Sequence, residues 1–341
     1  MPPHTAELRE ALEAILSRNH VPGLPVVAIE RCPSAYRSSY PLEELRVSLG
    51  GGAALELIFK DLSRESMSEA ARRAKPEFLH NPLREIEAYR ALLAGARLET
   101  PHCYGAAVDG RIGRYWLFLE KVPGDELYKI GDFSIWESAA RWLARMHQQF
   151  AAQNAATALR SVHWLKYDAD FFGMWMRRAH ELTSRSGASG PPGARRNIAR
   201  LAVHYDRVVE RLAALPATFI HGEFYASNIL IAHGNPGRRV CPIDWEMAAV
   251  GPGLIDLAAL ISGRWSEAQQ TALACAYYAS LADTGGPGPL REEQFLKAID
   301  ICRLHLAVQW LGWSDNWTPP ADHAHDWLAE ALHLAEKVGC L

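Results

Sequence analysis

The residues best suited to carry out chemistry lie between positions 219 and 246, where the chain reads FIHGEFYASNILIAHGNPGRRVCPIDWE. Two short apolar-rich runs, 229–232 and 239–243, flank a Gly-Asn-Pro-Gly turn and predict a β-hairpin. Because an antiparallel hairpin returns to where it began, we expect Asn228 and Asp244 to lie side by side at one end. Their amide and carboxylate oxygens, with a second acid at Glu223, are ligands suited to Mg²⁺. The segment therefore predicts a magnesium site.

The spacing of these residues matches that of phosphoryl-transfer enzymes. Protein kinases carry H-R-D-x-x-x-x-N, in which the acid positions the acceptor hydroxyl and the Asn holds the metal. Glu223 and Asn228 are likewise five positions apart, and Asp244-Trp245-Glu246 follows where kinases carry D-F-G. Each motif alone is a weak signal, because any strand-to-loop junction can contain H-G-E. The two motifs together, with a hairpin between them, favour a kinase-like site.

This stretch resembles the aminoglycoside phosphotransferase and choline kinase-like family, whose pattern is H-G-D-x-x-x-x-N followed by I-D-[WF]-E. Glu223 is a departure, because the family normally has Asp there. The resemblance implies Mg²⁺ held by Asn228 and Asp244, ATP or GTP as the phosphoryl donor, and Glu223 as the acid that orients the acceptor hydroxyl and receives its proton. It also implies that His221 supports the catalytic loop by hydrogen bonding.

A lysine and a glutamate of the first half are expected to complete the nucleotide site. Lys60 ends a strand of alternating character, LELIFK. The resemblance implies that it contacts the α- and β-phosphates and is oriented by a helix glutamate. The candidates are Glu85 and Glu87, and the family spacing of a Glu seven residues before a Leu favours Glu85 with Leu92. Taken alone, Lys60 would be a surface lysine and Glu85 a solvated helix residue, so the pair depends on the hairpin motifs.

The loop that covers the phosphates is not the obvious glycine run. The three glycines at 50–52 lie between the second and third strands, whereas a kinase phosphate loop connects the first two. We therefore expect this loop at 31–40, RCPSAYRSSY, which contains no glycine. Ser34, Ser38 and Ser39 are its candidate donors to the phosphates.

The segment 117–122, LFLEKV, resembles the hinge strand of the family. Backbone groups at Glu120 and Val122 would then hold the edge of the base, which leaves ATP and GTP as alternatives. Because the lobes of this fold join at the hinge, we expect a nucleotide-binding lobe over 1–121. A helical lobe with the catalytic hairpin and the acceptor site would cover 122–341.

The resemblance implies an α+β, protein-kinase-like bilobal fold, with an N-terminal antiparallel sheet lobe around one main helix and a larger, mostly helical C-terminal lobe. Apolar periodicity is consistent with that order. It predicts a helix at 5–19, strands at 25–29, 42–49, 54–59, 102–108 and 114–122, helical spacing at 66–94 broken by Pro76 and Pro82, and a long helix at 135–150.

Composition bounds the partners and the compartment. The chain has 341 residues, a net charge of −3 and 49% hydrophobic residues, so no basic field favours nucleic acid or an anionic membrane. The first 20 residues contain acids where a secretory signal needs an apolar run, and no stretch reaches the roughly 18 apolar residues of a membrane helix. The six cysteines form no C-x-x-C pair. These features predict a cytosolic protein without a zinc site.

The acceptor is less defined. Aromatic and acidic residues gather in the C-terminal part, at Trp310, Trp313, Trp317, Trp327, Asp315, Asp322 and Asp326. They could bind a cationic amine, or simply pack helices and cap loops. The acceptor alternatives are an aminoglycoside, an amino alcohol, a sugar or another hydroxylated metabolite. A protein kinase fits less well, because the chain reaches Gly251 soon after Asp244 and no A-P-E follows. The main rival function is a pseudokinase that binds nucleotide without transferring phosphate, because Glu223 is one methylene longer than Asp.

Overall fold

The five-stranded antiparallel sheet expected in the first half is present in the computed structural model, in the order β1-β2-β3-β5-β4. The structure describes residues 5–19, 25–36, 39–151, 160–185, 193–234, 238–263, 265–282, 290–314 and 325–341. The elements of the first half are α1 (Thr5–Asn19), β1 (Val26–Pro33), β2 (Leu42–Leu49), β3 (Ala54–Asp61), α2 (Glu69–Ala74), α3 (Pro82–Glu87), β4 (Cys103–Asp109), β5 (Arg114–Glu120) and β6 (Gly124–Glu126). The predicted helix at 5–19 and the predicted strands are confirmed, with β1 and β3 longer than expected.

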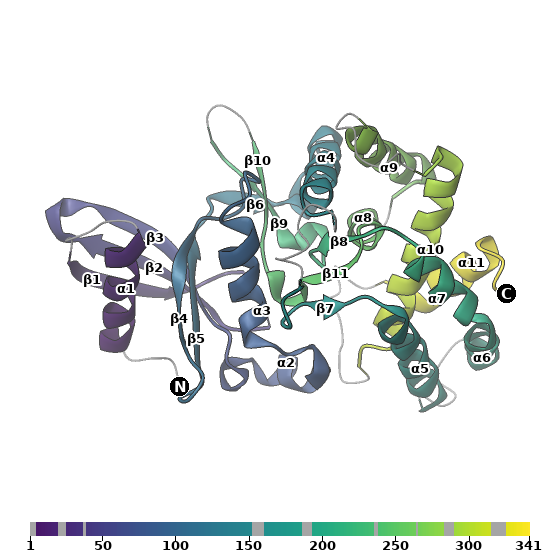
Figure 1. Ribbon diagram of the computed structural model, residues 1–341, viewed down its shortest axis with the longest axis horizontal. Helices are drawn as coiled ribbons and strands as arrows, with labels where there is room; N and C mark the ends of the chain where they lie inside the picture. Colours follow the sequence, from purple (N-terminus) through teal and green to yellow (C-terminus); the bar gives the residue numbers. More distant parts are fainter. Residues whose placement is uncertain are drawn as a thin grey trace. The chain divides into compact units, whose positions relative to one another are not determined.

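The later elements are mostly helical, as predicted. They are α4 (Phe133–Gln149), β7 (Leu165–Lys166), α5 (Ala169–Arg185), α6 (Ala194–His204), α7 (Asp206–Ala213), β8 (Ala217–Ile220), β9 (Ile229–Ala232), β10 (Arg239–Pro242), β11 (Ala249–Pro252), α8 (Leu254–Leu260), α9 (Glu267–Ala282), α10 (Glu292–Leu311) and α11 (Trp327–Lys337) (Figure 1). The predicted hairpin is formed by β9 and β10. An antiparallel sheet unit with a mostly helical unit is the protein-kinase-like fold.

Backbone contacts divide the chain into two units. The first contains Met1–Arg73, Glu77–Asp125 and Leu230–Glu246, and the second contains Ala74–Pro76, Glu126–Ile229 and Met247–Leu341. The hairpin therefore groups with the sheet unit, whereas the sequence placed it in the helical lobe. The reason is strand pairing, because β9 lies between β10 and β6, and β6 directly follows the hinge.

The sheet of the first unit has one apolar face and one face that carries the site. Alternation along β3 directs Leu57 and Phe59 to a buried core that also contains Leu8, Leu12 and Leu16 of α1. In Figure 1, α1 lies against this sheet, and it contacts β4 and β1 at the two edges. Lys60, the next residue, must point to the opposite face because successive side chains of a strand alternate.

Helical spacing over 66–94 was predicted, and the structure breaks it into short pieces. The α2 helix ends before Pro76, and Pro82 occupies the first turn of α3, where its missing N–H costs nothing. The Asn81 side chain caps α3 by accepting a hydrogen bond from the Leu83 N–H. A π-helical turn, Ala88–Leu93, follows. These pieces place Glu85 in the first turn of α3.

The hairpin sheet requires a glycine at the start of β6. A Cβ on Gly124 would lie 2.8 Å from the Ile231 carbonyl carbon and 2.9 Å from the Ala232 Cα. Both neighbours are backbone atoms and cannot move aside, so only glycine allows β6 to pair this closely with β9.

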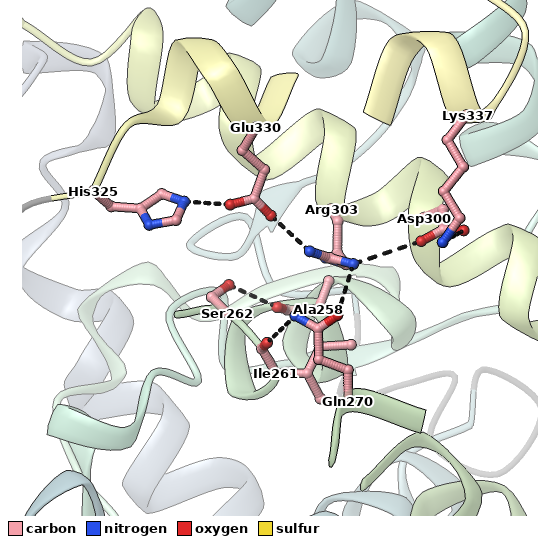
Figure 2. A network of polar contacts seen from close by, with 9 residues as sticks. All are labelled: Ala258, Ile261, Ser262, Gln270, Asp300, Arg303, His325, Glu330 and Lys337. Carbon is pink, nitrogen blue, oxygen red and sulfur yellow. Dashed lines mark hydrogen bonds and ion pairs between the residues drawn. The ribbon is translucent and has the colours of Figure 1, made fainter. Parts of the chain in front are cut away.

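The second unit is built from helices around a short sheet of β7, β11 and β8. Its C-terminal helices are joined by the ionic network in Figure 2. Arg303 of α10 donates to Glu330 of α11 at 3.0 Å and to Gln270 of α9 at 3.2 Å, while Lys337 of α11 contacts Asp300 at 2.8 Å. Glu330 also pairs with His325. The network fixes α11 after residues 315–324, which lie outside the described part of the chain.

Among the described residues, no helix has both the length and the apolar character needed to cross a membrane.

Candidate active site

A buried charge cluster lies on the polar face of the first unit's sheet. The Lys60 ammonium contacts the Glu85 carboxylate at 2.6 Å and the Asp244 carboxylate at 2.5 Å. Lys60 and Glu85 are 3% and 2% exposed. The structure therefore brings together three residues that are 25 and 184 positions apart. Glu85, not Glu87, is the partner of Lys60, as the sequence favoured.

Asp244 is held in an unusual backbone conformation. Its φ is +63°, in the left-handed region that only Gly, Asn and Asp visit readily. The following Trp245 is fully buried, and its indole N–H donates to the Pro242 carbonyl at 3.3 Å. Strain of this kind is retained where the surrounding structure over-determines it, often at functional sites. Here the bend at the end of β10 directs the Asp244 carboxylate to Lys60.

The cluster holds more negative than positive charge. Burial opposes a charge on Lys60, but Asp244 and Glu85 outweigh it and raise the Lys60 pKa above its usual value. Burial raises the pKa of Glu85 to about 7, against the opposing effect of Lys60. Lys60 therefore stays charged and is shared between two acids. Such a cluster is suited to a cation that brings phosphates with it.

The loop between β1 and β2 uses its serines to fix itself. The Ser34 hydroxyl donates to Glu44 at 3.1 Å and accepts from the Tyr36 N–H at 3.3 Å. The Ser39 hydroxyl donates to Glu246 at 2.7 Å. Ser38 lies outside the described residues. The two described serines are thus engaged with acids, and their expected role as phosphate donors stays a prediction.

The hinge candidates have structural contacts of their own. The Glu120 carboxylate accepts from Arg239 at 2.6 Å and from the His102 N–H at 2.9 Å. Val122 is 4% exposed in an apolar cluster with Leu230 and Cys241. Only the backbone at Glu120 and Val122 was predicted to contact the base, and these side-chain contacts hold that backbone in place.

The second unit carries the H-G-E loop, whose shape is set by a buried aspartate. Asp256 of α8 accepts from the His221 N–H at 2.7 Å and from the Gly222 N–H at 2.9 Å. Gly222 has a φ of +84°, and a Cβ there would overlap the Met247 carbonyl. Only glycine allows this bend, and Glu223, the next residue, is partly exposed.

Further contacts orient the residues around Glu223. His221 Nδ1 accepts from the Glu223 N–H at 3.3 Å, which agrees with the supporting role expected for His221. The Asn228 amide NH₂ donates to the Glu223 carbonyl at 3.0 Å. Because the NH₂ group is used there, the Asn228 side-chain oxygen is the atom left to act as a ligand.

A second layer of buried groups supports Asp256. His147 of α4 lies with Nε2 3.2 Å from the Asp256 carboxylate and Nδ1 2.8 Å from the Tyr277 hydroxyl. A Cβ on Gly253 would lie 2.7 Å from His147 Nδ1, so the helix start packs directly on the ring. The sequence gave no signal for His147 and Tyr277, which lie 109 and 21 residues from Asp256.

The donor atoms fit Mg²⁺ chemically. Asn228 and Asp244 offer an amide and a carboxylate oxygen, the hard ligands that Mg²⁺ prefers. Mg²⁺ in kinase sites uses one or two protein ligands together with phosphates and water. It therefore needs no closed protein cage, and within the described residues no group of three or more His, Cys, Asp or Glu forms one.

Two residues near Lys60 were not predicted. The Tyr40 ring is 4% exposed, with the Lys60 ammonium 5.5 Å from its centroid. Arg84 donates to the Glu246 carbonyl at 2.7 Å, which ties α3 to the segment after Asp244. Arg84 looks like a surface helix residue in the sequence, so only its position next to Glu85 could have indicated this contact.

The aromatic residues expected near the acceptor are packed on one another. Trp310 stacks on Trp327 with centroids 5.7 Å apart, and its N–H donates to the Tyr225 hydroxyl at 2.6 Å. Asp326 caps α11 by accepting from the Ala329 N–H at 2.9 Å. Trp317, Asp315 and Asp322 lie outside the described residues.

Comparison with known proteins agrees with this fold and these motifs. The model of the phosphotransferase enzyme family (APH) matches residues 46–293. This match covers most of the chain, including the Lys60 strand, the H-G-E loop and the I-D-W-E segment. The chain belongs to the phosphotransferase enzyme family. Among curated proteins, none is similar enough to be matched to it.

Several solved structures share the fold at low sequence identity. A choline kinase from Cryptosporidium parvum Iowa II has a TM-score of 0.60 and 14% identity, with 97% of each chain covered. The GDP complex of a mutant aminoglycoside 2'-phosphotransferase-IIIa has a TM-score of 0.57 and 13% identity, again over 97% of each chain. A microcompartment-associated aminopropanol kinase has a TM-score of 0.56 and 14% identity, over 98% of this chain and 95% of the other.

Proposed function

We propose that this protein is a small-molecule kinase that transfers the γ-phosphate of ATP or GTP, with Mg²⁺, to a hydroxyl group of its acceptor. The observation that carries the proposal is the buried contact of Lys60 with Glu85 and Asp244. A surface lysine and a solvated helix acid, the alternatives that the sequence allowed, would not be buried together. Kinases use this combination to hold phosphates and metal.

The charges of the cluster support a metal-dependent nucleotide site. The Lys60 ammonium is shared with Asp244. A triphosphate that approached alone would meet the Asp244 carboxylate and the partly protonated Glu85 beside one ammonium. Mg²⁺ would supply the missing positive charge, with Asp244 and Asn228 as its protein ligands. Asp244 would then release Lys60 to the phosphates.

The H-G-E loop supports transfer over the pseudokinase alternative. Asp256 and Gly222 fix the backbone of the loop that carries the partly exposed Glu223. Lys60, Asn228 and Asp244 are also all present, which argues against a degenerate site. Glu223 would orient the acceptor hydroxyl and receive its proton, and positioning of this kind supplies much of the rate in phosphoryl transfer.

The names of the structural neighbours support the classes of donor and acceptor. Two are GDP complexes of aminoglycoside 2'-phosphotransferase-IIIa, and others are choline and aminopropanol kinases. We therefore retain ATP and GTP as donors, and an aminoglycoside, an amino alcohol, a sugar or another metabolite as acceptor. All six cysteines are free thiols. This state fits the reducing cytosol, where we place the protein, with no nucleic-acid or membrane partner.

Calorimetric titration with ATP and GTP, each with and without Mg²⁺, tests the nucleotide site. We expect Mg²⁺-dependent binding of at least one nucleotide, lost in Asp244→Ala and retained in the control Asp170→Ala, which changes an exposed acid of α5. If neither nucleotide binds the wild-type protein, the proposed function is wrong.

Transfer of a labelled γ-phosphate to a panel of aminoglycosides, amino alcohols and sugars tests the catalytic step. We expect Glu223→Gln to abolish transfer while nucleotide binding persists. Glu223→Asp should lower the rate about 100-fold, because an error near 1 Å in position has that effect. Nucleotide binding with no transfer to any acceptor, and no nucleotide hydrolysis, would favour the pseudokinase alternative.

A further inference from the structure

The glycine-free loop of the first unit places a tyrosine on an apolar surface beside the hinge. Val122, Leu230, Ala232 and Cys241 form a small buried cluster, and Tyr36 and Ile243 pack against it as its partly exposed members. The Tyr36 hydroxyl donates to the Gly124 carbonyl at 3.3 Å. One aromatic side chain thus packs on the cluster and donates to a backbone acceptor of β6, directly after the hinge.

A chain of polar contacts also fixes the backbone at Tyr36. The Tyr36 N–H donates to the Ser34 hydroxyl, which in turn donates to Glu44. Glu44 pairs with Lys121 at 2.6 Å, one residue before Val122. The start of the loop is therefore anchored to the hinge itself, and this anchoring delivers the ring to the apolar cluster.

The same surface has the properties that a purine base requires. It is apolar, it adjoins the backbone of the hinge, and Ile243 directly precedes Asp244, where the phosphates and metal would be held. A base that lies on Val122 and Ile243 would meet the ring of Tyr36. The ring and the base therefore compete for one surface.

We propose that Tyr36 occupies the base-binding surface in the nucleotide-free protein and must be displaced by the base, so that it sets the affinity for nucleotides without affecting phosphate binding. The proposal rests on the proposed function, because it takes the first unit to be the nucleotide site. The contact with Gly124 stabilises the occupied form, so breaking it shifts the equilibrium toward the form that accepts a base.

The test measures association rates and affinities of ATP, GTP and inorganic tripolyphosphate, each with Mg²⁺, for the wild-type protein, Tyr36→Phe and Tyr36→Ala. Tyr36→Phe keeps the ring and loses only the hydroxyl. One hydrogen bond contributes enough to shift such an equilibrium roughly 2- to 10-fold. We expect the variant to bind ATP or GTP tighter by that factor, with the gain in the association rate. Tyr36→Ala should associate at least as fast.

Two controls separate this proposal from the proposed function. Tripolyphosphate has no base, so its binding should be the same in all three proteins. Tyr128→Phe, at a tyrosine that is 40% exposed in the second unit, should leave every value unchanged. Lack of binding by the wild-type protein to both nucleotides and to tripolyphosphate would refute the nucleotide site. If nucleotides bind but their association rates are the same in Tyr36→Phe, the role of Tyr36 is refuted and the proposed function is not. The same holds if the association rate of tripolyphosphate changes in parallel with those of the nucleotides.

Discussion

Asp256→Asn should release the H-G-E loop, and the structure gives the size of the effect. Asp256 is fully buried and accepts hydrogen bonds from the His221 and Gly222 N–H groups, at 2.7 and 2.9 Å, beside His147 Nε2 at 3.2 Å. Asparagine has almost the same shape, but one of its two polar atoms is an NH₂ group that cannot accept. At least one backbone N–H must therefore lose its partner in the variant.

One buried N–H loses its charged acceptor in this variant. Leaving a buried donor without its partner costs about 1–3 kcal/mol, and a bond to a charged group lies in the upper part of that range. The second unit should therefore be destabilised by about 2–3 kcal/mol. Because the hydrogen bonds to Asp256 hold the bend at Gly222, we also expect the loop to relax and the Glu223 carboxylate to change position. Phosphate transfer should fall about 100-fold, as for other errors of position.

Urea unfolding and amide hydrogen exchange measure the two effects separately. The exchange of a peptide that contains residues 219–225 should rise in Asp256→Asn even under native conditions. Asp170→Asn, an exposed acid in the first turn of α5, is the matched control and should change neither value. A loss of stability below about 1 kcal/mol, with unchanged exchange at Gly222, would refute the reasoning that a charged acceptor shapes this loop.

Three other predictions concern Glu85, His305 and Gly124. Glu85→Gln removes a carboxylate that contacts Lys60 at 2.6 Å, so calorimetry should show Mg²⁺–ATP or Mg²⁺–GTP binding about 10-fold weaker; equal affinity would contradict the pairing. Burial lowers the pKa of His305 to about 3, so the neutral imidazole contributes its full stability above pH 6.5. The free energy of unfolding should fall by about 1.4 kcal/mol per pH unit as the pH drops from 6.5 toward 3. In urea unfolding at several pH values, His305→Gln should show a smaller dependence of this free energy on pH, and an equal dependence would refute the role of His305. Gly124→Ala should lower the melting temperature because its Cβ meets backbone, whereas Gly95→Ala, with open space around it, should not; equal melting would contradict the close approach.

The extent to which the sequence predicted the fold depends on how local each signal is. The bounds of β2, 42–49, were predicted to the residue, because alternation within eight positions is enough to indicate a strand. The pieces between 66 and 94 were not predicted, since Pro76 and Pro82 indicate breaks but not the π-helical turn that follows α3. The grouping of the hairpin with the first unit depends on pairing of β9 with β6, which lies about 100 residues earlier and has no local signal.

The candidate site shows the same limit. Family spacing indicated Lys60 and Glu85, and the structure places them in contact. The sequence indicated Ser34 and Ser39 as candidate donors to the phosphates, which stays a prediction, but it did not indicate that their hydroxyls contact Glu44 and Glu246. The sequence shows that a loop serine can donate a hydrogen bond, but its acceptor depends on which acid the fold brings near. The same holds for Tyr36, whose contact with the hinge crosses 88 positions.

The order of events at the first unit follows from which contacts the free protein has already made. Lys60 already contacts Asp244, and Tyr36 already covers the apolar cluster at Val122. The phosphates of a nucleotide would therefore replace Asp244 at Lys60, and the base would replace Tyr36 on the apolar cluster. An internal ion pair is exchanged at little net cost only if the incoming group restores the charge balance, and a triphosphate does so only with Mg²⁺. The metal dependence we expect is thus a consequence of the Lys60–Asp244 contact, and a variant that removes Asp244 should lose it together with the affinity.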